Sequence, residues 1–479
     1  MKESNPSRLT KIIATLGPAS ASRDKIRELA EAGVNVFRLN LSHGDHDALR
    51  TWIGWIRGAE KSLKTYLGIL LDLQGPKIRV GRFEDGAILL ERGSVLTFTT
   101  EKKIGNATLV PVQYSNFHKE VEVGMQVHLD DGNLCVRVLK VSGKRVQMVV
   151  EVGGRLSNFK GMNMPDATIK ASSLTRKDKE DLKFGLQMKV DFVALSFAGS
   201  AKDIELLRRL IRAGGGDAEI IAKIERKQAV RNLEEIIGAA DAVMVARGDL
   251  GVEIPLAEVP VVQQRILQEC ARQAKPVIVA TQMLETMITN SRPTRAEVSD
   301  ISNAVMYCAD AIMLSGETAV GAYPIAAVKV MAETVRHTEA FQCQTQRILP
   351  WSGFFKESPP INLGITYSAN RMVELLNAKA IIVFTLSGGT AKMVASPHPM
   401  VPVFAFTSSL ERARRLALLR GAIPFLVEKS QNLFNDMAPI FNILKKRKLL
   451  EKGDRVVITT GMPIGIPSWT NVIRVEITP

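Results

Sequence analysis

The sequence predicts an α/β protein whose main part is a (β/α)8 barrel. A small all-β lid domain is inserted into this barrel, and a separate α/β domain follows at the C-terminus. Three observations lead to this prediction. Short apolar segments alternate eight times with longer amphipathic ones, which is typical of parallel strands joined by helices. One run of short β-like segments interrupts the alternation, and a proline- and serine-rich stretch at 349–360 precedes a third series of strands.

Eight barrel strands are expected, three before the interruption and five after it. Their expected positions are 11–17, 34–44, 66–75, 191–197, 219–225, 242–251, 276–284 and 311–319. Amphipathic segments predict helices at 22–33, 45–63, 175–187, 204–214, 228–240, 261–274, 296–308 and 324–341. An open doubly wound sheet is the structural alternative, but eight units in one series favour a closed TIM barrel.

The interruption runs from Pro76 to about Lys170 and has the pattern of a small all-β domain. Strands are expected at 95–100, 126–129, 134–141 and 145–152, with turns at Asp131-Gly132 and Ser142-Gly143. Pro76 and Pro165 lie near its two ends, where a restricted backbone suits a hinge. We therefore expect a barrel domain formed by 1–75 and 171–345, an inserted β-barrel lid domain at 76–170, and a C-terminal α/β domain at 357–479.

The C-terminal domain is expected to have its own sheet, because apolar segments again alternate with helical ones. The strands are expected at 380–388, 401–408, 423–428, 454–461 and 471–477. This organisation agrees with the length of the chain, since 479 residues are too many for one ordinary hydrophobic core.

Composition narrows the class of protein. Hydrophobic residues make up 46% of the chain and charged residues 23%, as in soluble globular proteins, and no apolar run is long enough to span a membrane. The four cysteines are widely spaced and the N-terminus lacks a secretory signal, so we expect a cytoplasmic protein. The net charge of +14 suits anionic small substrates, and aromatic residues do not interleave with the basic clusters, so nucleic acid is not expected as a partner.

Polar side chains occur at the C-terminal ends of seven of the eight expected barrel strands. They are Arg38, Asn40, Ser42, Asp72, Ser196, Lys223, Glu225, Arg247, Asp249, Thr281, Gln282, Ser315 and Glu317. Catalytic groups of such barrels sit at this end. Lys223 and Glu225 are two residues apart and therefore project to the same side of their strand. Alone they are equally typical of a structural ion pair, but the other strand ends favour an active site.

The residue types indicate phosphoryl transfer. Glu225 and Asp249 suit a hard cation such as Mg²⁺, which keeps waters and takes substrate oxygens. Arg38 offers a planar fork for phosphate or carboxylate, and Lys223 offers a point charge for developing negative charge. The glycines around Gly248 let backbone N–H groups approach an anion. Phosphoryl transfer needs mainly positioning and charge neutralisation.

The motifs RLNLSHG, LDLQGPKIRVG, AKIE, VARGDLGVEIP, ATQMLE, PTRAEVSDISNAV and MLSGETAVGAYP resemble those of pyruvate kinases, in the same order and spacing. The resemblance covers nearly the whole chain. It implies phosphoryl transfer from phosphoenolpyruvate to ADP, with Mg²⁺ or Mn²⁺ as the cofactor, and it implies a homotetramer.

The resemblance also implies roles for individual residues. Catalytic and substrate-binding roles fall on Arg38, Lys223, Gly248, Asp249, Thr281, Ser315 and Glu317, with Mg²⁺ on Glu225 and Asp249. Arg38 would bind the substrate phosphate, Lys223 would stabilise the phosphoryl group and the enolate, and Thr281 would help a water-linked relay deliver a proton. Nucleotide-binding roles fall on Arg79, Lys160, Asn40 and His43. For Thr281, a plain barrel hydroxyl bonded to the backbone is the alternative interpretation.

One position departs from many members of the family. Those members read LDTKGPEIR where this chain reads LDLQGPKIR, so that Lys77 replaces a glutamate. In such members the equivalents of Asn40, Ser42 and Asp72 surround an essential K⁺ together with that glutamate. We expect the ammonium of Lys77 to supply the same positive charge, and hence an enzyme that needs Mg²⁺ but not K⁺.

The C-terminal domain carries TLSGGTAK between a strand and a helix, which predicts a phosphate-sized nest or, more plainly, a capped turn. Because members of the family bind phosphorylated effectors in this loop, we expect allosteric activation through Thr385, Ser387, Gly388, Gly389 and Thr390. Two other functions remain open on the residues alone. One is a Mg²⁺-dependent lyase or aldolase acting on related substrates, and the other is a metabolite-binding regulator on an inactive barrel.

Overall fold

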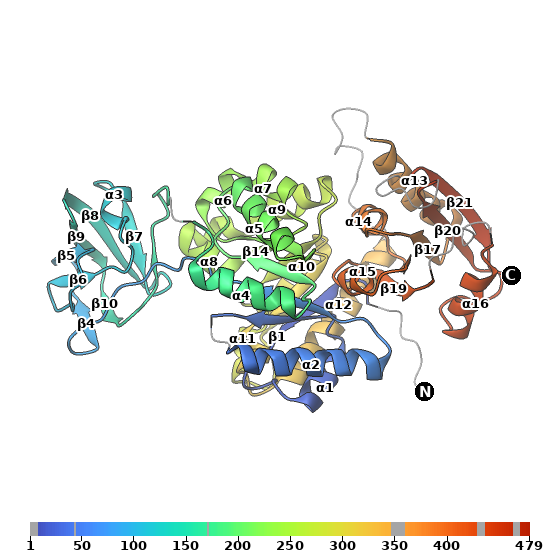
Figure 1. The fold of residues 1–479 in the computed structure, drawn as a ribbon, viewed down its shortest axis with the longest axis horizontal. Coiled ribbons are helices and arrows are strands. Elements are labelled where there is room, and N and C mark those ends of the chain that lie inside the picture. The colour runs from blue at the N-terminus through green and yellow to red at the C-terminus, as the bar shows by residue number, and fades with distance from the viewer. Residues whose placement is uncertain (1–7, 43–44, 170–171, 346–359, 429–435, 463–469) are drawn as a thin grey trace.

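The computed structural model describes residues 8–42, 45–169, 172–345, 360–428, 436–462 and 470–479. Figure 1 shows the inserted β segment, the barrel and the C-terminal α/β segment following one another along the long axis of the molecule. The predicted joint at 349–360 lies outside the described residues except for Pro360. In the part of the chain described here, no helix combines the length and the apolar character needed to cross a bilayer.

The predicted closed barrel of eight parallel strands is confirmed. The strands, in chain order, are β1 (Lys11–Thr15), β2 (Val36–Asn40), β3 (Gly68–Asp72), β12 (Phe192–Leu195), β13 (Glu219–Ile224), β14 (Ala242–Ala246), β15 (Val277–Ala280) and β16 (Ala311–Leu314). Each strand pairs with its neighbours in sequence, and β1 closes the ring against β16.

Helices follow the strands around the outside. They are α1 (Arg23–Ala32), α2 (His46–Leu63), α4 (Arg176–Gln187), α5 (Ala201–Ala213), α6 (Lys227–Arg231), α7 (Leu233–Ala239), α8 (Arg247–Glu253), α9 (Val259–Arg272), α10 (Arg295–Met306), α11 (Gly316–Ala319) and α12 (Pro324–Thr345), with short 3₁₀ turns η1 (Leu256–Glu258) and η2 (Glu285–Ile288). The predicted helix at 228–240 is two helices, α6 and α7. Asn232 separates them, and its side-chain amide donates to the carbonyl of Gly199 at 2.8 Å.

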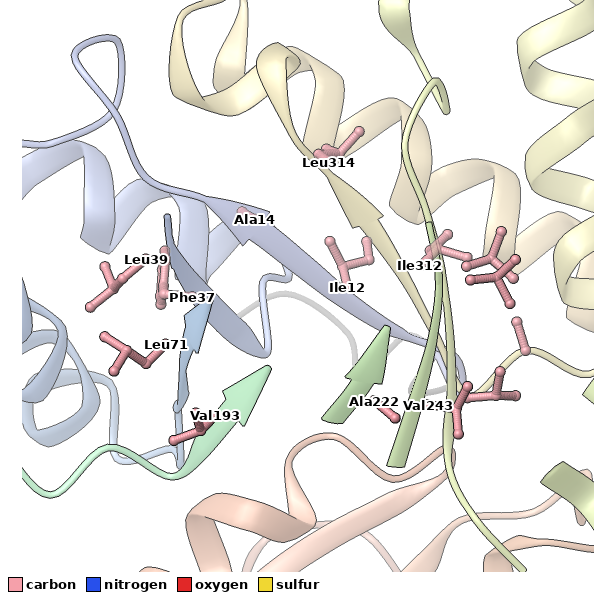
Figure 2. Close-up of a cluster of buried hydrophobic side chains, with 14 of the residues drawn as sticks. Ile12, Ala14, Phe37, Leu39, Leu71, Val193, Ala222, Val243, Ile312 and Leu314 are labelled. Carbon is pink, nitrogen blue, oxygen red and sulfur yellow. The ribbon is translucent and has the colours of Figure 1, made fainter. Parts of the chain in front are cut away.

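Alternation along the strands produces two apolar layers. One set of side chains, including Ile12, Leu39 and Val243, packs between the strands and the surrounding helices (Figure 2). The other set, including Ile13 and Met244, fills the barrel interior. Lys223 has the same parity as the interior residue Ile221, so its side chain enters the interior at the C-terminal end of β13.

All eight barrel strands are shorter than expected, and in two of them the polar end forms a short helix. The segment expected as a strand at 242–251 leaves the sheet after Ala246, and residues from Arg247 onward form α8. The segment expected at 311–319 likewise continues as α11 after Leu314. The strand ends therefore place the first turns of helices, rather than extended backbone, at the mouth of the barrel.

The segment between β3 and α4 is all-β apart from one short helix. Its elements are β4 (Ala87–Leu90), β5 (Val95–Thr99), β6 (Leu109–Pro111), α3 (Phe117–Glu120), β7 (Gln126–Leu129), β8 (Leu134–Ser142), β9 (Arg145–Val152), β10 (Gly154–Ser157) and β11 (Met162–Asn163). They form a six-stranded sheet, β11-β7-β8-β9-β5-β6, and a two-stranded sheet, β10-β4, around a separate core.

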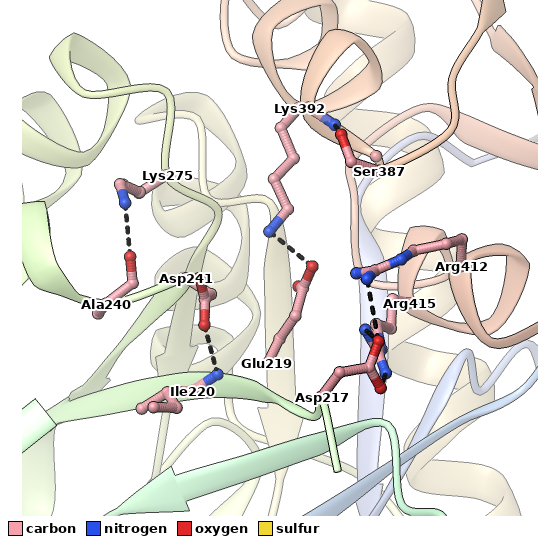
Figure 3. Close-up of polar contacts among 12 residues, drawn as sticks. Asp217, Glu219, Ile220, Ala240, Asp241, Lys275, Ser387, Lys392, Arg412 and Arg415 are labelled. Carbon is pink, nitrogen blue, oxygen red and sulfur yellow. Dashed lines mark hydrogen bonds and ion pairs between the residues drawn. The ribbon is translucent and has the colours of Figure 1, made fainter. Parts of the chain in front are cut away.

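The C-terminal segment has a five-stranded sheet in the order β19-β18-β17-β20-β21. Its elements are α13 (Ile361–Leu376), β17 (Ala380–Phe384), α14 (Gly389–Ala395), β18 (Val403–Thr407), α15 (Leu410–Leu416), β19 (Ala422–Leu426), α16 (Ala438–Lys446), β20 (Arg455–Thr460) and β21 (Val472–Ile477). It packs against the end of the barrel where the strands begin, since Leu418 joins the interior cluster and Lys392 contacts Glu219, the first residue of β13 (Figure 3).

Candidate active site

The ammonium of Lys223 is the centre of the polar cluster at the C-terminal end of the barrel. Its Nζ lies 2.7 Å from Oε1 of Glu225, 3.4 Å from Oδ1 of Asp72 and 2.7 Å from Oγ of Ser196. These groups follow three adjacent strands, β3, β12 and β13. The side chains of Lys223, Glu225 and Asp72 are all buried, with relative exposures of 8%, 1% and 2%. The predicted neighbourhood of Lys223 and Glu225 is therefore present in the structure.

The charges in this cluster shift the pKa values of their neighbours. Burial alone would raise the pKa of the Asp72 carboxyl, but Lys223 and Arg38 bring it below its usual range. Burial alone would lower the pKa of Lys223, but Asp72 and Glu225 raise it above its ordinary value. Burial and the nearby charge of Asp249 raise the pKa of Glu225, against the opposing effect of Lys223. A protonated lysine consequently stands among acids at the barrel mouth.

Arg38 projects from β2 toward the same acid. Its Nε and Nη2 each lie 2.7 Å from Oδ2 of Asp72, and its Nη1 donates to Oγ1 of Thr15 at 3.0 Å. Strand register explains this placement, because β2 and β3 are paired along their whole length and end together at Asn40 and Asp72. Asp72 therefore orients both cations of the site. The family resemblance implied a place for Asp72 near a monovalent cation, and the sequence did not predict its contacts with Arg38 and Lys223.

Glycine and threonine meet where α8 begins. The backbone N–H of Gly248 donates to Oγ1 of Thr281 at 2.8 Å, and that hydroxyl donates to the carbonyl of Ala280 at 2.6 Å. Thr281 has φ = +68°, a backbone conformation in the left-handed region. The structure thus shows the backbone-bonded hydroxyl that was the alternative interpretation of Thr281, and it also places this hydroxyl next to the first turn of α8, which contains Asp249.

Arg247 is a residue whose contacts the sequence did not predict. Its Nη1 lies 2.6 Å from Oδ2 of Asp300 in α10, and its Nη2 donates to the carbonyl of Thr281 at 2.6 Å. Val243 and Val245 share its parity and pack outward against the helices. Arg247 therefore leaves the barrel on the helix side, where it fastens the Thr281 loop. The sequence alone does not show whether an arginine at the polar end of a strand points into the barrel interior or out toward the helices.

Ser315 and Glu317 form part of the loop scaffold at the end of β16. The Glu317 carboxylate accepts hydrogen bonds from the backbone N–H groups of Ser315 at 2.7 Å and Leu284 at 2.9 Å. Its side chain is 1% exposed. Glu317 consequently ties the β15 and β16 loops together, and its contacts in this structure are with backbone groups.

The basic residues predicted to bind nucleotide lie on the β-rich segment. Lys160 is 2.6 Å from Oδ1 of Asp130, and Arg79 donates to the carbonyl of Phe159 at 3.0 Å. The amide oxygen of Asn40 accepts from the backbone N–H of Ser42 at 3.1 Å, on the barrel side. His43 lies outside the described residues.

Lys77 does not contact the cluster around Asp72 in this structure. Its Nζ lies 3.6 Å from Oδ1 of Asp131, at the tip of the β7–β8 turn, and both side chains are partly exposed, at 32% and 70%. Such a pair contributes little to stability. The lysine is thus placed at the junction between the barrel and the β-rich segment, next to Gly161.

The predicted metal ligands have a donor set that fits a divalent cation. Glu225 and Asp249 follow neighbouring strands, and burial together with the charge of Asp249 raises the pKa of Glu225. Within the described ranges, no group of three or more His, Cys, Asp and Glu side chains forms a metal-sized cluster. Two carboxylates suit Mg²⁺, which takes its remaining oxygens from water and substrate.

The predicted effector loop surrounds the start of α14. Thr385 Oγ1 accepts from the N–H of Gly388 at 3.0 Å, and Ser387 Oγ accepts from the N–H of Gly389 at 3.4 Å. Gly388 has φ = +90°, which a residue with a side chain rarely adopts. The hydroxyl of Thr390 pairs with that of Thr470 at 2.8 Å. The loop is therefore internally bonded, which is also the geometry of the capped turn considered above.

Two family models match the chain, one over the barrel with its inserted β segment and one over the C-terminal α/β segment. Residues 7–328 match the family described as "Pyruvate kinase, barrel domain", and residues 364–476 match "Pyruvate kinase, alpha/beta domain". A pyruvate kinase of Corynebacterium glutamicum is 44% identical over 471 residues, covering 98% of each chain. A pyruvate kinase of Mycobacterium tuberculosis is 42% identical, over 97% of this chain and 98% of that one.

A solved structure shows the same architecture. A pyruvate kinase from Cryptosporidium parvum superposes with a TM-score of 0.93 at 33% sequence identity, covering 98% of this chain and 96% of the other. The agreement extends over the barrel, the inserted β segment and the C-terminal α/β segment alike.

Proposed function

The chain belongs to the pyruvate kinase family, and on that premise we propose that it transfers the phosphoryl group of phosphoenolpyruvate to ADP, giving pyruvate and ATP. The observation that carries this proposal is the contact of Lys223 with Glu225 and Asp72, beside the Arg38 fork, at the C-terminal end of the barrel. A cation held among acids there matches a reaction whose charge develops on phosphoryl and enolate oxygens.

The cluster supplies the chain's own contributions to phosphoryl transfer. Arg38, fixed by Asp72, presents the rest of its guanidinium fork to the substrate phosphate. Lys223 is held protonated and neutralises charge on the transferring group and on the enolate. The first turn of α8, with Gly248 and Asp249, lies where the substrate carboxylate is expected to bind.

We propose Glu225 and Asp249 as the ligands of Mg²⁺ or Mn²⁺, which when bound bridges substrate oxygens and offsets their charge. We propose that the Thr281 hydroxyl, which is bonded to Ala280 and Gly248, passes a proton through water to the enolate carbon. Ser315 and Glu317 support the loop that carries it. Arg79 and Lys160 are proposed to approach the nucleotide phosphates from the inserted lid domain, with Asn40 and His43 on the barrel side.

Lid contacts with the barrel mouth support this arrangement. The side-chain amide of Asn163, in β11, donates to Oε1 of Glu253, in α8, at 2.8 Å, and Nζ of Lys227, in α6, lies 2.7 Å from Oδ1 of Asp166. The β-rich segment is therefore tethered to the helices that follow β13 and β14, over the proposed metal ligands. A lid in this position is suited to exclude water during transfer.

The test is a coupled assay for pyruvate formation from phosphoenolpyruvate, run with and without ADP. We expect pyruvate and ATP in equal amounts, only when ADP and Mg²⁺ are both present. Pyruvate formed without ADP would support a lyase instead, and an absence of turnover would support a regulatory protein. Pyruvate formation that persists after complete Mg²⁺ and Mn²⁺ chelation would contradict the proposed metal role.

We further propose that the enzyme does not need K⁺, on the basis of Lys77, and that it is a cytoplasmic homotetramer activated by a phosphorylated metabolite. The effector loop is supported by its position, because Lys392 of α14 lies 2.9 Å from Glu219, where β13 begins (Figure 3). That strand ends at Lys223 and Glu225. Light scattering in solution measures the assembly, and activity titrations with sugar phosphates and nucleoside monophosphates identify the activator.

A further inference from the structure

A polar cavity lies on the outer side of the barrel rim, next to the active-site cluster. It has a volume of about 380 Å³ and is lined by the β12–α5 loop, the first part of α5, the start of α6 and the segment that returns from the lid. Arg226 and Phe197 form part of its wall. We call this space the Arg226 cavity.

Arg226 reaches this cavity because consecutive residues of an extended chain point to opposite sides, and Arg226 directly follows Glu225. Glu225 continues the interior parity of Lys223, whereas Ile224 packs outward in the layer between strands and helices. The backbone at Arg226 is extended, with φ = −120° and ψ = 150°, so its side chain leaves on the side of Ile224. Two consecutive residues therefore face different spaces, Glu225 the active site and Arg226 the outer cavity.

The Arg226 guanidinium is buried, and among the described residues it has no hydrogen-bonding partner. The residue is 7% exposed, and its guanidinium stacks over the ring of Phe197, with Cζ 4.6 Å from the ring centroid. No described side chain forms a hydrogen bond or ion pair with it. Burial lowers its pKa, which shows the cost of holding this charge away from water. A buried guanidinium with free donors is suited to bind an anion.

The nearby carboxylates are occupied by other donors. Asp203 accepts from the N–H groups of Gly199 and Ser200 at 3.0 and 2.9 Å and from the hydroxyl of Ser173 at 2.9 Å. Glu253 accepts from Asn163 at 2.8 Å. Neither acid lies within ion-pairing distance of Arg226, although Glu253, Glu225 and Asp203 all attract its charge from farther away.

Two further cations line the cavity from α5. Lys202 and Arg209 are exposed, lie two turns apart on the same helix face, and have no ion-pair partner among the described residues. Together with Arg226 they outnumber the single lining carboxylate, Asp203. The hydroxyls of Ser172 and Ser200 donate to the carbonyl of Leu174 and to Oδ2 of Asp203, each at 3.2 Å, so the charged side chains are the donors that remain for an anion.

We propose that the Arg226 cavity is a binding site for a small dianion, of the size and charge of phosphate or a phosphate monoester, with Arg226 as its buried anchor. The site is separate from the interior positions of Arg38 and Lys223 and from the effector loop. It also adjoins the active site, because the N–H of Phe197 donates to Oε2 of Glu225 at 2.7 Å. The inference stands independently of the reaction proposed above.

The first test locates the anion. Crystals of the full-length protein are soaked in selenate, a phosphate-sized dianion whose anomalous signal reveals its position. We expect a peak within hydrogen-bonding distance of the Arg226 guanidinium, and we expect Arg226→Gln to remove it. A cavity without a peak, in crystals where selenate occupies other sites, overturns the proposal.

The second test uses surface variants, so that it does not depend on how Arg226→Gln folds. Affinity for inorganic phosphate is measured by thermal unfolding for Lys202→Gln/Arg209→Gln and for the control Lys183→Gln/Arg212→Gln, which removes two exposed charges outside the cavity. In the first variant we expect the affinity of the Arg226 cavity for phosphate to fall about tenfold, because the loss of charge-assisted hydrogen bonds has effects of this size. Equal phosphate affinities in the two variants contradict the proposal.

Discussion

The guanidinium of Arg38 holds the carboxylate of Asp72 through two nitrogens, each 2.7 Å from the same oxygen, Oδ2. The other carboxylate oxygen lies 3.4 Å from Lys223. Asp72 thus connects the two cations of the site and is 2% exposed. A buried acid that contacts two cations helps to fix their positions and offsets their mutual repulsion.

Replacing Asp72 by Asn tests this role, because the amide keeps the shape and removes the charge. We expect kcat/KM for phosphoenolpyruvate to fall by about 100-fold, a typical loss when a buried charged contact of an active site is broken. Ser196→Ala is the matched control, since it removes only a neutral partner of Lys223 and is expected to cost much less. Equal losses in the two variants would show that the charge of Asp72 has no special role.

Lys223 is expected to act mainly on the chemical step. Lys223→Met should lower kcat by about 1000-fold, because the charge that forms during transfer is then no longer neutralised. Steady-state kinetics measures the effect, and Lys275→Met at the opposite end of the barrel controls for the loss of a partly buried lysine. A Lys223→Met enzyme with kcat near that of the control would exclude Lys223 from the chemical step.

Much of this site could be predicted from the sequence because strand parity and strand ends are local patterns. The eight strands and the common side of Lys223 and Glu225 follow from local sequence patterns. The direction of Arg247 did not follow, because it depends on Asp300, which is 53 residues later in the chain. The partner of Lys77 is likewise set by Asp131 on the inserted segment. Contacts between elements distant in sequence leave no periodic signal.

Stability should depend on pH through Lys11, at the end of the barrel where strands begin. Burial lowers the pKa of Lys11 to about 7, and its Nζ donates to the carbonyl of Ala422 at 2.7 Å. Because the folded-state pKa lies below the ordinary value of 10.5, the unfolded chain binds the proton more tightly. The contribution of Lys11 to stability is therefore lost as the pH falls from the ordinary lysine range through 7.

The free energy of unfolding of Lys11→Met, measured by denaturant titration at several pH values, checks this sign. The free energy of unfolding of the variant, relative to that of the parent protein, should be highest near pH 6 and should fall as the pH rises toward about 10. Lys25→Met, on the exposed face of α1, provides a control that lacks the buried environment. A stability difference that does not change with pH would contradict the inferred shift.

Lys77 provides a test of the proposed K⁺ independence. The parent enzyme should keep its activity when K⁺ is replaced by tetramethylammonium, because the chain already carries a positive charge next to the lid. Lys77→Glu should create a dependence on K⁺. Without K⁺, we expect this variant to have about one tenth of its activity with K⁺, or less, since an unbalanced carboxylate then stands near the anionic substrate. Strong activation of the parent enzyme by K⁺ would show that Lys77 does not replace the cation.

The contact of Lys392 with Glu219 predicts how the effector loop communicates with the active site. Lys392 belongs to α14, which begins in that loop, and Glu219 starts the strand that ends at Lys223. Thr385→Ala/Ser387→Ala/Thr390→Ala should abolish activation by removing effector binding, with basal turnover retained. Lys392→Met should keep effector binding, measured by calorimetry, and lose most of the activation, because couplings of this kind amount to about 5- to 150-fold.

The coupling experiment needs a variant that changes charge without touching the contact. Lys379→Met serves this purpose, because Lys379 is an exposed lysine of the same domain that precedes β17. If effector binding to the Lys392→Met enzyme still produces the full activation seen in the Lys379→Met control, the signal travels through other contacts of the interface. The next contacts to examine are then the ion pairs that Asp217 forms with Arg412 and Arg415 (Figure 3). Asp217 lies two residues before Glu219, so these pairs join α15 to the same end of β13.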